Sequence, residues 1–171
     1  MIFGAAQVTL LRDEAYHFLQ LGAFLERGDN TARIVDVKFH LLRPDGNPRA
    51  DKPDYFAWSE VLACIGAVRS YRRIYRSALD PMKVAELMML RRDVPRSVYH
   101  CLWMVDLSMR ELAETYAHHG EADRLAGELH ARLRYTRIDQ IFEMGLGKFL
   151  GGVRADIGQL SDEIGRQFLL D

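Results

Sequence analysis

Five ionisable residues in the first quarter of the chain are spaced as if they shared one face of a helix. Three or four positions separate each from the next, and they are Glu26, Asp29, Arg33, Asp36 and His40. At about 100° per residue, this spacing confines them to an arc of roughly 80°. Carboxylates and an imidazole brought together in this way can transfer protons, and an arginine among them can hold an anionic substrate. We therefore treat Glu26, Asp36 and His40 as candidate catalytic residues.

The residues around this charged stripe predict that it points into the protein. Apolar residues border it on both edges: Phe18, Leu21, Leu25, Val35 and Phe39 on one, and Leu19, Ala23, Ile34, Val37 and Leu41 on the other. Polar residues mark the opposite side as the solvent face, namely Gln20, Arg27, Thr31 and Lys38. Buried charges are stable only when they are paired. We therefore expect Glu26, Asp29, Arg33 and Asp36 to be mostly buried and mutually paired around Arg33.

Two interpretations of a buried charged stripe remain open. It can be a structural ladder, because Asp29 and Arg33 are four positions apart, and Arg33 and Asp36 three, which suits ion pairs along a helix. It can instead line a polar pocket or face a partner, because perturbed ionisable groups cluster at functional sites. Glu26, Asp29 and Asp36 could also coordinate a hard cation, but Arg33 among them would repel it. We therefore expect no metal and no cofactor.

Two further segments carry arginines suited to anionic ligands. The first, residues 69–76, contains Arg69, Tyr71, Arg72, Arg73, Tyr75 and Arg76. Arginine forks with interleaved tyrosines suit carboxylates and phosphates, although a solvated basic helix end has the same composition. The spacing from Ile65 and Arg69 predicts that Arg72 faces inward. In the second segment, Arg96 precedes Ser97 at the start of another predicted helix, where backbone N–H groups favour an anion.

Capping residues and helix breakers predict the elements that position these side chains. Asp13, Asp80 and Gly120 serve as caps, and residues 44–48 form a turn. The predicted helices span residues 13–43, 54–78, 81–90, 95–118, 121–135 and 138–169. Glycines at 151 and 152 predict either a break or close helix packing within the last of these. Strand-like alternation is missing, so the predicted fold is all-α, one domain over residues 1–171 built as a bundle of about six helices.

Composition and charge narrow the class of protein. The 171-residue chain has 49% hydrophobic and 27% charged residues, which is typical of a globular domain. Its net charge of −1 argues against general binding to nucleic acids or to anionic membranes, which requires a basic excess. No apolar run is long enough to span a bilayer, and residues 1–11 lack the pattern of a signal peptide. Cys64 and Cys101 have no CxxC neighbour and are expected to be buried thiols in a reducing, cytoplasmic compartment.

Several different short motifs follow one another in a characteristic order along nearly the whole chain. They are Leu21-Gly22, the segment from Leu25 to Val37 that contains Glu26-Arg27, Tyr71 to Tyr75, Asp80-Pro81 with Val84 to Leu90, Val94 to Val98 with Cys101, Leu129 to Tyr135, and Gly145-Leu146 with Phe149-Leu150. This order resembles the Alpha-E family, a bacterial all-helical family defined by its Glu-Arg motif. Members usually have Ala where this chain has Gly28, which is expected to loosen the helix there. Typical members are much longer, and this chain resembles the C-terminal half of their architecture.

The resemblance implies a setting rather than a reaction. Members are associated with circularly permuted ATP-grasp proteins and with transglutaminase-like proteins, which implies a role in making or modifying peptide or amide bonds. Three functions follow: a helical partner domain that binds the ligase or its peptide substrate, an enzyme that uses the charged stripe, or a structural interaction module. The residues proposed to bind a substrate are Arg27, Asp29, Arg33, Arg72, Arg96 and Tyr135. The very apolar segment from Val84 to Leu90 also predicts a homo-oligomer or a complex with a helical partner.

Overall fold

The described part of the chain is built from helices. The computed structural model describes residues 10–42 and 55–168, and no strand occurs within these ranges. The helices there are α2 (Glu14–Leu42), α3 (Tyr55–Cys64), α4 (Val68–Tyr75), α5 (Pro81–Leu90), α6 (Val98–Tyr116), α7 (Glu121–Tyr135), α8 (Ile138–Met144) and α9 (Leu146–Phe168). The all-α prediction is therefore confirmed, whereas the expected number of about six helices is too low for the described ranges, which hold eight.

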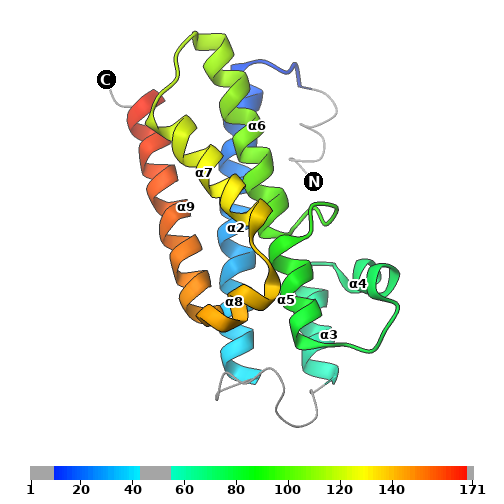
Figure 1. The fold of residues 1–171 in the computed structure, drawn as a ribbon. Helices are drawn as coiled ribbons and strands as arrows, with labels where there is room; N and C mark the ends of the chain where they lie inside the picture. Colours follow the sequence, from blue (N-terminus) through cyan, green and yellow to red (C-terminus); the bar gives the residue numbers. More distant parts are fainter. Residues whose placement is uncertain (1–9, 43–54, 169–171) are drawn as a thin grey trace.

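Four of these helices, α2, α6, α7 and α9, form the bundle at the centre of the fold (Figure 1). α2 packs against α6 and α9, and α7 packs against the same two helices, so that α2 and α7 occupy opposite corners. Neighbouring helices are antiparallel: the Phe18 ring near the start of α2 meets Phe168 at the end of α9, and residues 117–120 turn α6 back into α7. Each helix therefore buries one face and exposes another.

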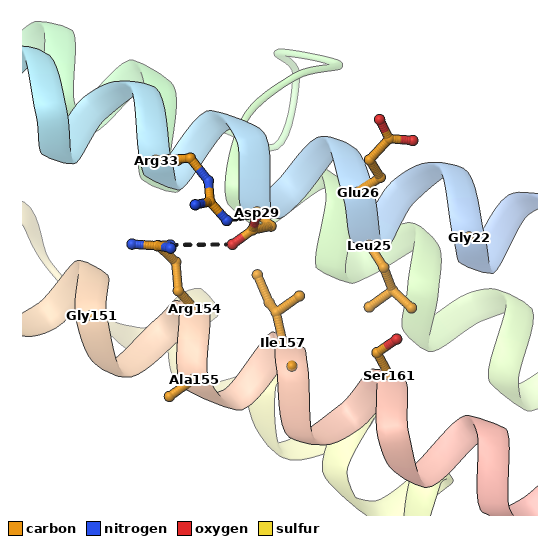
Figure 2. A pocket seen from close by; sticks show the side chains of 11 residues that line it. Gly22, Leu25, Glu26, Asp29, Arg33, Gly151, Arg154, Ala155, Ile157 and Ser161 are labelled. Carbon is orange, nitrogen blue, oxygen red and sulfur yellow. Dashed lines mark hydrogen bonds and ion pairs between the residues drawn. The ribbon is translucent and has the colours of Figure 1, made fainter.

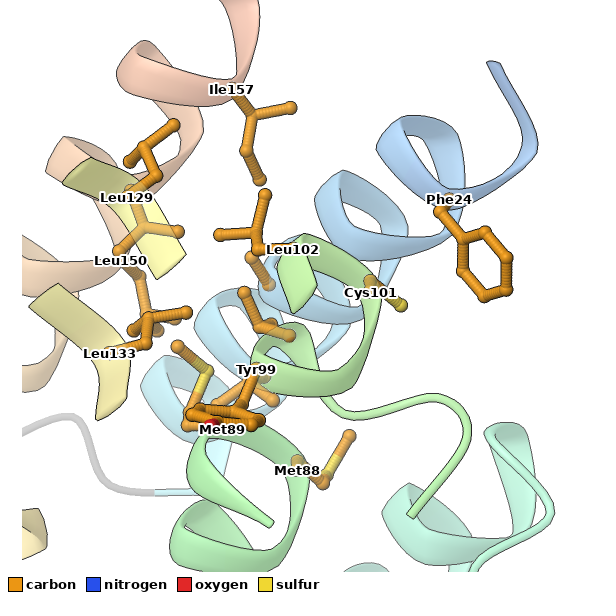
Figure 3. Close-up of a cluster of buried hydrophobic side chains, with 14 of the residues drawn as sticks. Phe24, Met88, Met89, Tyr99, Cys101, Leu102, Leu129, Leu133, Leu150 and Ile157 are labelled. Atoms are coloured by element: carbon orange, nitrogen blue, oxygen red, sulfur yellow. The ribbon is translucent and has the colours of Figure 1, made fainter. Parts of the chain in front are cut away.

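The core of the bundle is centred on α6. Its Cys101, Leu102 and Val105 side chains are each at most 1% exposed, and Figure 3 shows Leu102 among side chains from α7 and α9. Gly28 of α2 faces this core, because a β-carbon placed there would lie 3.4 Å from the Cys101 β-carbon and 3.7 Å from Cδ1 of Ile157. A β-carbon at this position would therefore make ordinary van der Waals contacts with α6 and α9. α2 passes through Gly28 as one continuous helix.

The shorter helices α3, α4, α5 and α8 gather toward one end of the bundle, the lower end in Figure 1. The Phe39 ring of α2 packs there against Trp58 of α3, with ring centroids 5.6 Å apart, and against Phe142 of α8, at 5.5 Å. The apolar side chains of α5 are buried among these elements; Val84, Leu87, Met88 and Met89 are all 0% exposed. Most of the apolar segment 84–90 is thus buried within this chain, so it cannot be the surface that binds a second copy or a partner.

The differences from the predicted helix boundaries lie mainly at two glycines. The predicted helix 54–78 divides into α3 and α4 near Gly66, whose φ is +69°. The predicted helix 138–169 divides into α8 and α9 at Gly145, whose φ is +96°. Side chains other than glycine rarely adopt such φ values, so these two positions end their helices. α9 runs unbroken through Gly151-Gly152, and both glycines are exposed with open space beside them, so the expected break or close packing is wrong.

Three smaller expectations are also settled. The helix predicted to begin at residue 95 begins at Val98, because Ser97 is the N-cap and accepts a hydrogen bond from the His100 backbone N–H. Cys101 is buried as expected, but Cys64 is exposed near the end of α3. None of the described helices combines the length and the apolar character needed to cross a bilayer.

The helix break at Gly145 can be tested by substitution. Gly145→Ala should lower the free energy of unfolding by about 1–3 kcal/mol, because alanine is strained at a positive φ. Gly152→Ala is the matched control and should raise it by up to about 1 kcal/mol, because alanine is the better residue inside a helix. Urea unfolding followed by far-ultraviolet circular dichroism measures both values. The opposite pattern, with Gly152→Ala the destabilising change, would place the break at Gly151-Gly152.

Candidate functional site

The charged stripe of α2 lies at the protein surface and not in the core. The residues of α2 that are buried are Gln20, Leu21, Phe24, Leu25, Gly28, Thr31, Ala32, Val35 and Phe39. Only one of the two apolar edges therefore faces the bundle, since Leu19 and Val37 of the other edge are 41% and 52% exposed. Glu26 is exposed, and so is Arg33. The prediction that the stripe is mostly buried is therefore wrong.

The predicted solvent face of α2 is also wrong, and the contacts there show why. Thr31 is buried against the chain that leads into α6, where its hydroxyl donates a hydrogen bond of 2.9 Å to the Arg96 carbonyl. Gln20 is buried as well, and its amide has no hydrogen-bond partner within the described residues. Arg27 and Lys38 are half-buried. Polar residues here border the core, so polarity alone did not identify the side that faces solvent.

Asp29, rather than Arg33, is the centre of the ion pairs (Figure 2). Nη2 of Arg33 lies 2.7 Å from Oδ2 of Asp29, which confirms the pair expected at four positions along the helix. Nε of Arg154, on α9, lies 3.2 Å from Oδ1 of Asp29. Nη1 of the same arginine lies 4.0 Å from Oδ2 of Asp36. Arg154 thus links two carboxylates of α2 to α9.

These arginines also change the acidity of Asp29. Burial by itself would raise the pKa of this carboxyl group, but hydrogen bonds and charge from Arg33 and Arg154 outweigh burial and hold the pKa below its ordinary value. Asp29 is therefore ionised at neutral pH. It is a structural anion that positions two arginines and cannot serve as a proton donor near pH 7.

A groove runs along the surface between α2 and α9 at this ion-pair cluster. It encloses about 670 Å³ and is lined by Gly22, Leu25, Glu26, Asp29, Arg33, Gly151, Arg154, Ala155, Ile157, Gly158 and Ser161. Leu25 and Ile157 are buried at its floor (Figure 2). A β-carbon added at Gly22, Gly151 or Gly158 would meet no atom within 4 Å. These three glycines therefore leave open space along the walls of the groove. We call this feature the α2–α9 groove.

A second cavity lies on the other side of Glu26. It encloses about 350 Å³ and is lined by Ala23, Glu26, Arg27, Asn30, Thr31, Ile34, Ile65 and Arg96. We call it the Arg27–Arg96 cavity. A neighbouring hollow of about 500 Å³ shares Ile65 and Arg96 with it and also includes the exposed Cys64. Glu26 lines both the groove and this cavity, and it has no hydrogen-bond or ion-pair partner within the described residues.

The two arginines of the cavity differ in what restrains them: the side chain of Arg27, but only the backbone of Arg96, makes such a contact within the described residues. The Arg27 guanidinium lies over the buried Phe24 ring, 4.8 Å from its centroid. Arg96 is anchored through its backbone carbonyl by Thr31, as described above. Burial raises the pKa of the nearby Cys101 thiol to about 12, and both Arg27 and Arg96 act in the opposite direction on it. Both arginines line the Arg27–Arg96 cavity.

The structure brings some of the predicted site residues together and leaves others apart. Glu26, Asp29 and Arg33 share the groove, and Arg27 and Arg96 share the cavity. Arg72 is exposed on α4, so the expected inward orientation is wrong, and it borders only a small hollow of about 60 Å³. Tyr135 is exposed at the end of α7, where Arg134 lies over its ring. His40 belongs to α2, but its side chain lies outside the described residues.

Two features of the structure were missed by sequence reasoning. One is Arg154, whose signal was a cation between Gly151-Gly152 and Ala155. The other is a polar cluster between α6 and α7, centred on the buried Asp106. Oδ2 of Asp106 lies 2.8 Å from Nδ1 of His130 and 2.7 Å from Nη2 of Arg110, and Nε2 of His130 lies 3.4 Å from the Tyr99 hydroxyl. Asp106 is the one ionisable residue in the segment 102–109, which was the signal for this cluster.

The buried Asp106 cluster is a cross-link between helices rather than a site. None of its residues lines the α2–α9 groove or the Arg27–Arg96 cavity. Within the described ranges, no group of three or more His, Cys, Asp or Glu residues has the arrangement to hold a metal ion. The stripe carboxylates that could have gathered around a cation are separated instead, since Asp29 and Asp36 turn toward Arg154 and Glu26 does not.

The ion pairs of Asp29 should make a pH-dependent contribution to the free energy of unfolding. Asp29→Asn should lower the free energy of unfolding by about 1 kcal/mol at pH 7, because partly exposed ion pairs contribute no more than this. Because the folded-state pKa is lowered, the contribution is present above the ordinary aspartate value of about 3.9 and disappears as the pH falls through the lowered pKa. Urea unfolding at several pH values measures this. Asp162→Asn, at an exposed residue of α9 with no ion pair within the described residues, is the control and should change little. An equal loss for Asp29→Asn at neutral and strongly acidic pH would contradict the pairing.

Comparison with known families agrees with the helical architecture. A family model described as a predicted alpha-helical domain with a conserved ER motif matches residues 1–169. Comparison with curated proteins and with solved structures finds no match. Glu26-Arg27 is the only Glu-Arg dipeptide in the sequence, and it lies where α2 separates the groove from the cavity. The chain belongs to the Alpha-E family.

Proposed function

We propose that this chain is a helical binding domain of a peptide-modifying system. In this proposal the α2–α9 groove holds a polypeptide segment of a circularly permuted ATP-grasp protein or of its peptide substrate, and the bond-forming chemistry takes place on the ATP-grasp protein. A transglutaminase-like protein is a further proposed partner in the same peptide-modifying system. The observation that carries the proposal is the groove itself, which has glycine walls, an apolar floor and charged groups at its rim.

The shape of the groove suits a polypeptide. Its volume of about 670 Å³ falls within the range of about 300–1,000 Å³ that is usual for ligand clefts. Because Gly22, Gly151 and Gly158 lack side chains, the backbone of a bound segment can approach the backbones of α2 and α9 closely. Leu25 and Ile157 supply an apolar surface beneath it.

The charge of the groove favours a peptide over a nucleotide. The charged residues that line it are Glu26, Asp29, Arg33 and Arg154, so two carboxylates balance two guanidinium groups. Asp29 is moreover occupied by both arginines. A polyphosphate ligand needs an excess of positive charge or a ring of backbone N–H donors. A neutral peptide segment needs neither, so we assign the groove to a polypeptide.

The arrangement of ionisable groups supports binding rather than catalysis. General acid–base chemistry needs a proton donor and an acceptor within reach of one reacting group. The lowered pKa of Asp29 keeps it ionised, and Glu26 has no ionisable partner within the described residues. Among the residues that the structure describes, no histidine lines the groove or the Arg27–Arg96 cavity. The chain therefore holds a partner segment and does not assemble an acid–base pair around it.

Filling the groove tests the proposal. Gly158→Leu should weaken binding of the purified chain to the circularly permuted ATP-grasp protein of the same organism by at least about tenfold, which corresponds to about 1.4 kcal/mol. The variant should fold, because leucine is the better helix former and has open space at this position. Isothermal titration calorimetry, with and without the peptide substrate of the ATP-grasp protein, measures the affinity.

Gly152→Leu is the matched control, because Gly152 is exposed on the same helix but does not line the groove. It should bind as the unmodified chain does. The proposal fails if neither the ATP-grasp protein nor its peptide binds, or if Gly158→Leu and Gly152→Leu bind equally well. Sedimentation that shows a dimer dissociated by Gly158→Leu would assign the groove to a second copy of this chain instead.

A further inference from the structure

We propose that the Arg27–Arg96 cavity is a separate site for a small α-amino acid with an aliphatic side chain, whose carboxylate is held by the two guanidinium groups and whose ammonium group is held by Glu26. This goes beyond the groove, because it assigns a second ligand, of a different chemical class, to the other side of the Glu-Arg motif.

The charges of the cavity call for an anionic group. Arg27 and Arg96 line it together with one carboxylate, Glu26, so it offers two guanidinium groups to a ligand. Arg96 makes no ion pair within the described residues. A carboxylate is the natural complement, because it accepts hydrogen bonds from guanidinium groups in a fixed geometry.

The Arg27 guanidinium and the Arg96 backbone are restrained before any ligand arrives. Stacking on the buried Phe24 ring restrains the Arg27 guanidinium. The Arg96 backbone is tied to α2 by Thr31, and the next residue, Ser97, is fixed as the N-cap of α6. Groups restrained in this way lose less conformational freedom on binding, which raises the affinity for a small ligand.

The remaining lining of the cavity selects among anions. Glu26 would repel a phosphate or a simple carboxylate, but it can accept hydrogen bonds from an ammonium group. Ala23, Ile34 and Ile65 offer apolar surface beside these charges. A volume of about 350 Å³ is at the small end of ligand sites. An aliphatic α-amino acid carries all three features on one carbon atom: a carboxylate, an ammonium group and an apolar side chain.

Nuclear magnetic resonance titration of the ¹⁵N-labelled full chain tests this site. L-leucine should give saturable shifts at the backbone amides of Asn30, Thr31 and Ile65, which line the cavity. Leucinamide lacks the carboxylate and 4-methylpentanoate lacks the ammonium group, so each should bind at least about tenfold more weakly. Inorganic phosphate is the third probe. Phosphate that binds as tightly as leucine would show an adventitious ion only and would overturn the proposal.

Substitutions complete the test. Arg96→Gln should weaken leucine binding at least about tenfold, whereas Arg73→Gln, an equal change of charge at an exposed residue of α4, should not affect it. Saturable binding that is absent, or equal in the two variants, would overturn the assignment. The groove variant Gly158→Leu should bind leucine normally, so failure of this site and failure of the groove proposal are distinguishable.

Discussion

The rotation of α2 about its own axis is the constraint on which the rest of the site depends. The face of α2 that enters the bundle carries Phe24, Leu25 and Gly28, and Gly28 lies against Cys101 of α6. Once that face is buried, the helix period of about 100° per residue turns Glu26 outward. The same rotation brings Asp29 to the edge shared with α9 and Arg27 to the edge shared with α6. The packing of this one face thus places the α2–α9 groove and the Arg27–Arg96 cavity on two sides of α2.

The ion pairs follow from this rotation and do not cause it. Asp29 and Asp36 lie at the border of the buried face, where Arg154 of α9 reaches them. Arg33 lies further from the buried face of α2, and its side chain is 54% exposed. The core supplies the energy that fixes α2, because apolar burial outweighs partly exposed ion pairs. The charged groups instead shape the rim of the groove and keep its total charge balanced.

The sequence predicted the helices well because their ends are local features. Asp80 before Pro81 and Tyr135 before Thr136 mark boundaries that the structure confirms. It could not predict the rotation of α2, because apolar residues border the charged stripe on both edges and only packing against α6 chooses between them. Arg154 was missed because the contact joins residues 125 positions apart. Composition also does not show that Gly145 ends a helix at a φ of +96°, whereas Gly151-Gly152 lie within a continuous helix.

Thiol accessibility tests the rotation of α2 most directly. In a Cys64→Ser background, which removes the exposed native thiol and leaves the buried Cys101, cysteine is introduced at Glu26 or at Gln20. Our account predicts that the Glu26→Cys thiol reacts with a water-soluble disulfide reagent as fast as in the unfolded chain. The Gln20→Cys thiol should be protected until the protein unfolds, because this position is 1% exposed. Protection at Glu26 and rapid reaction at Gln20 would contradict the account, because the charged stripe would then face the core.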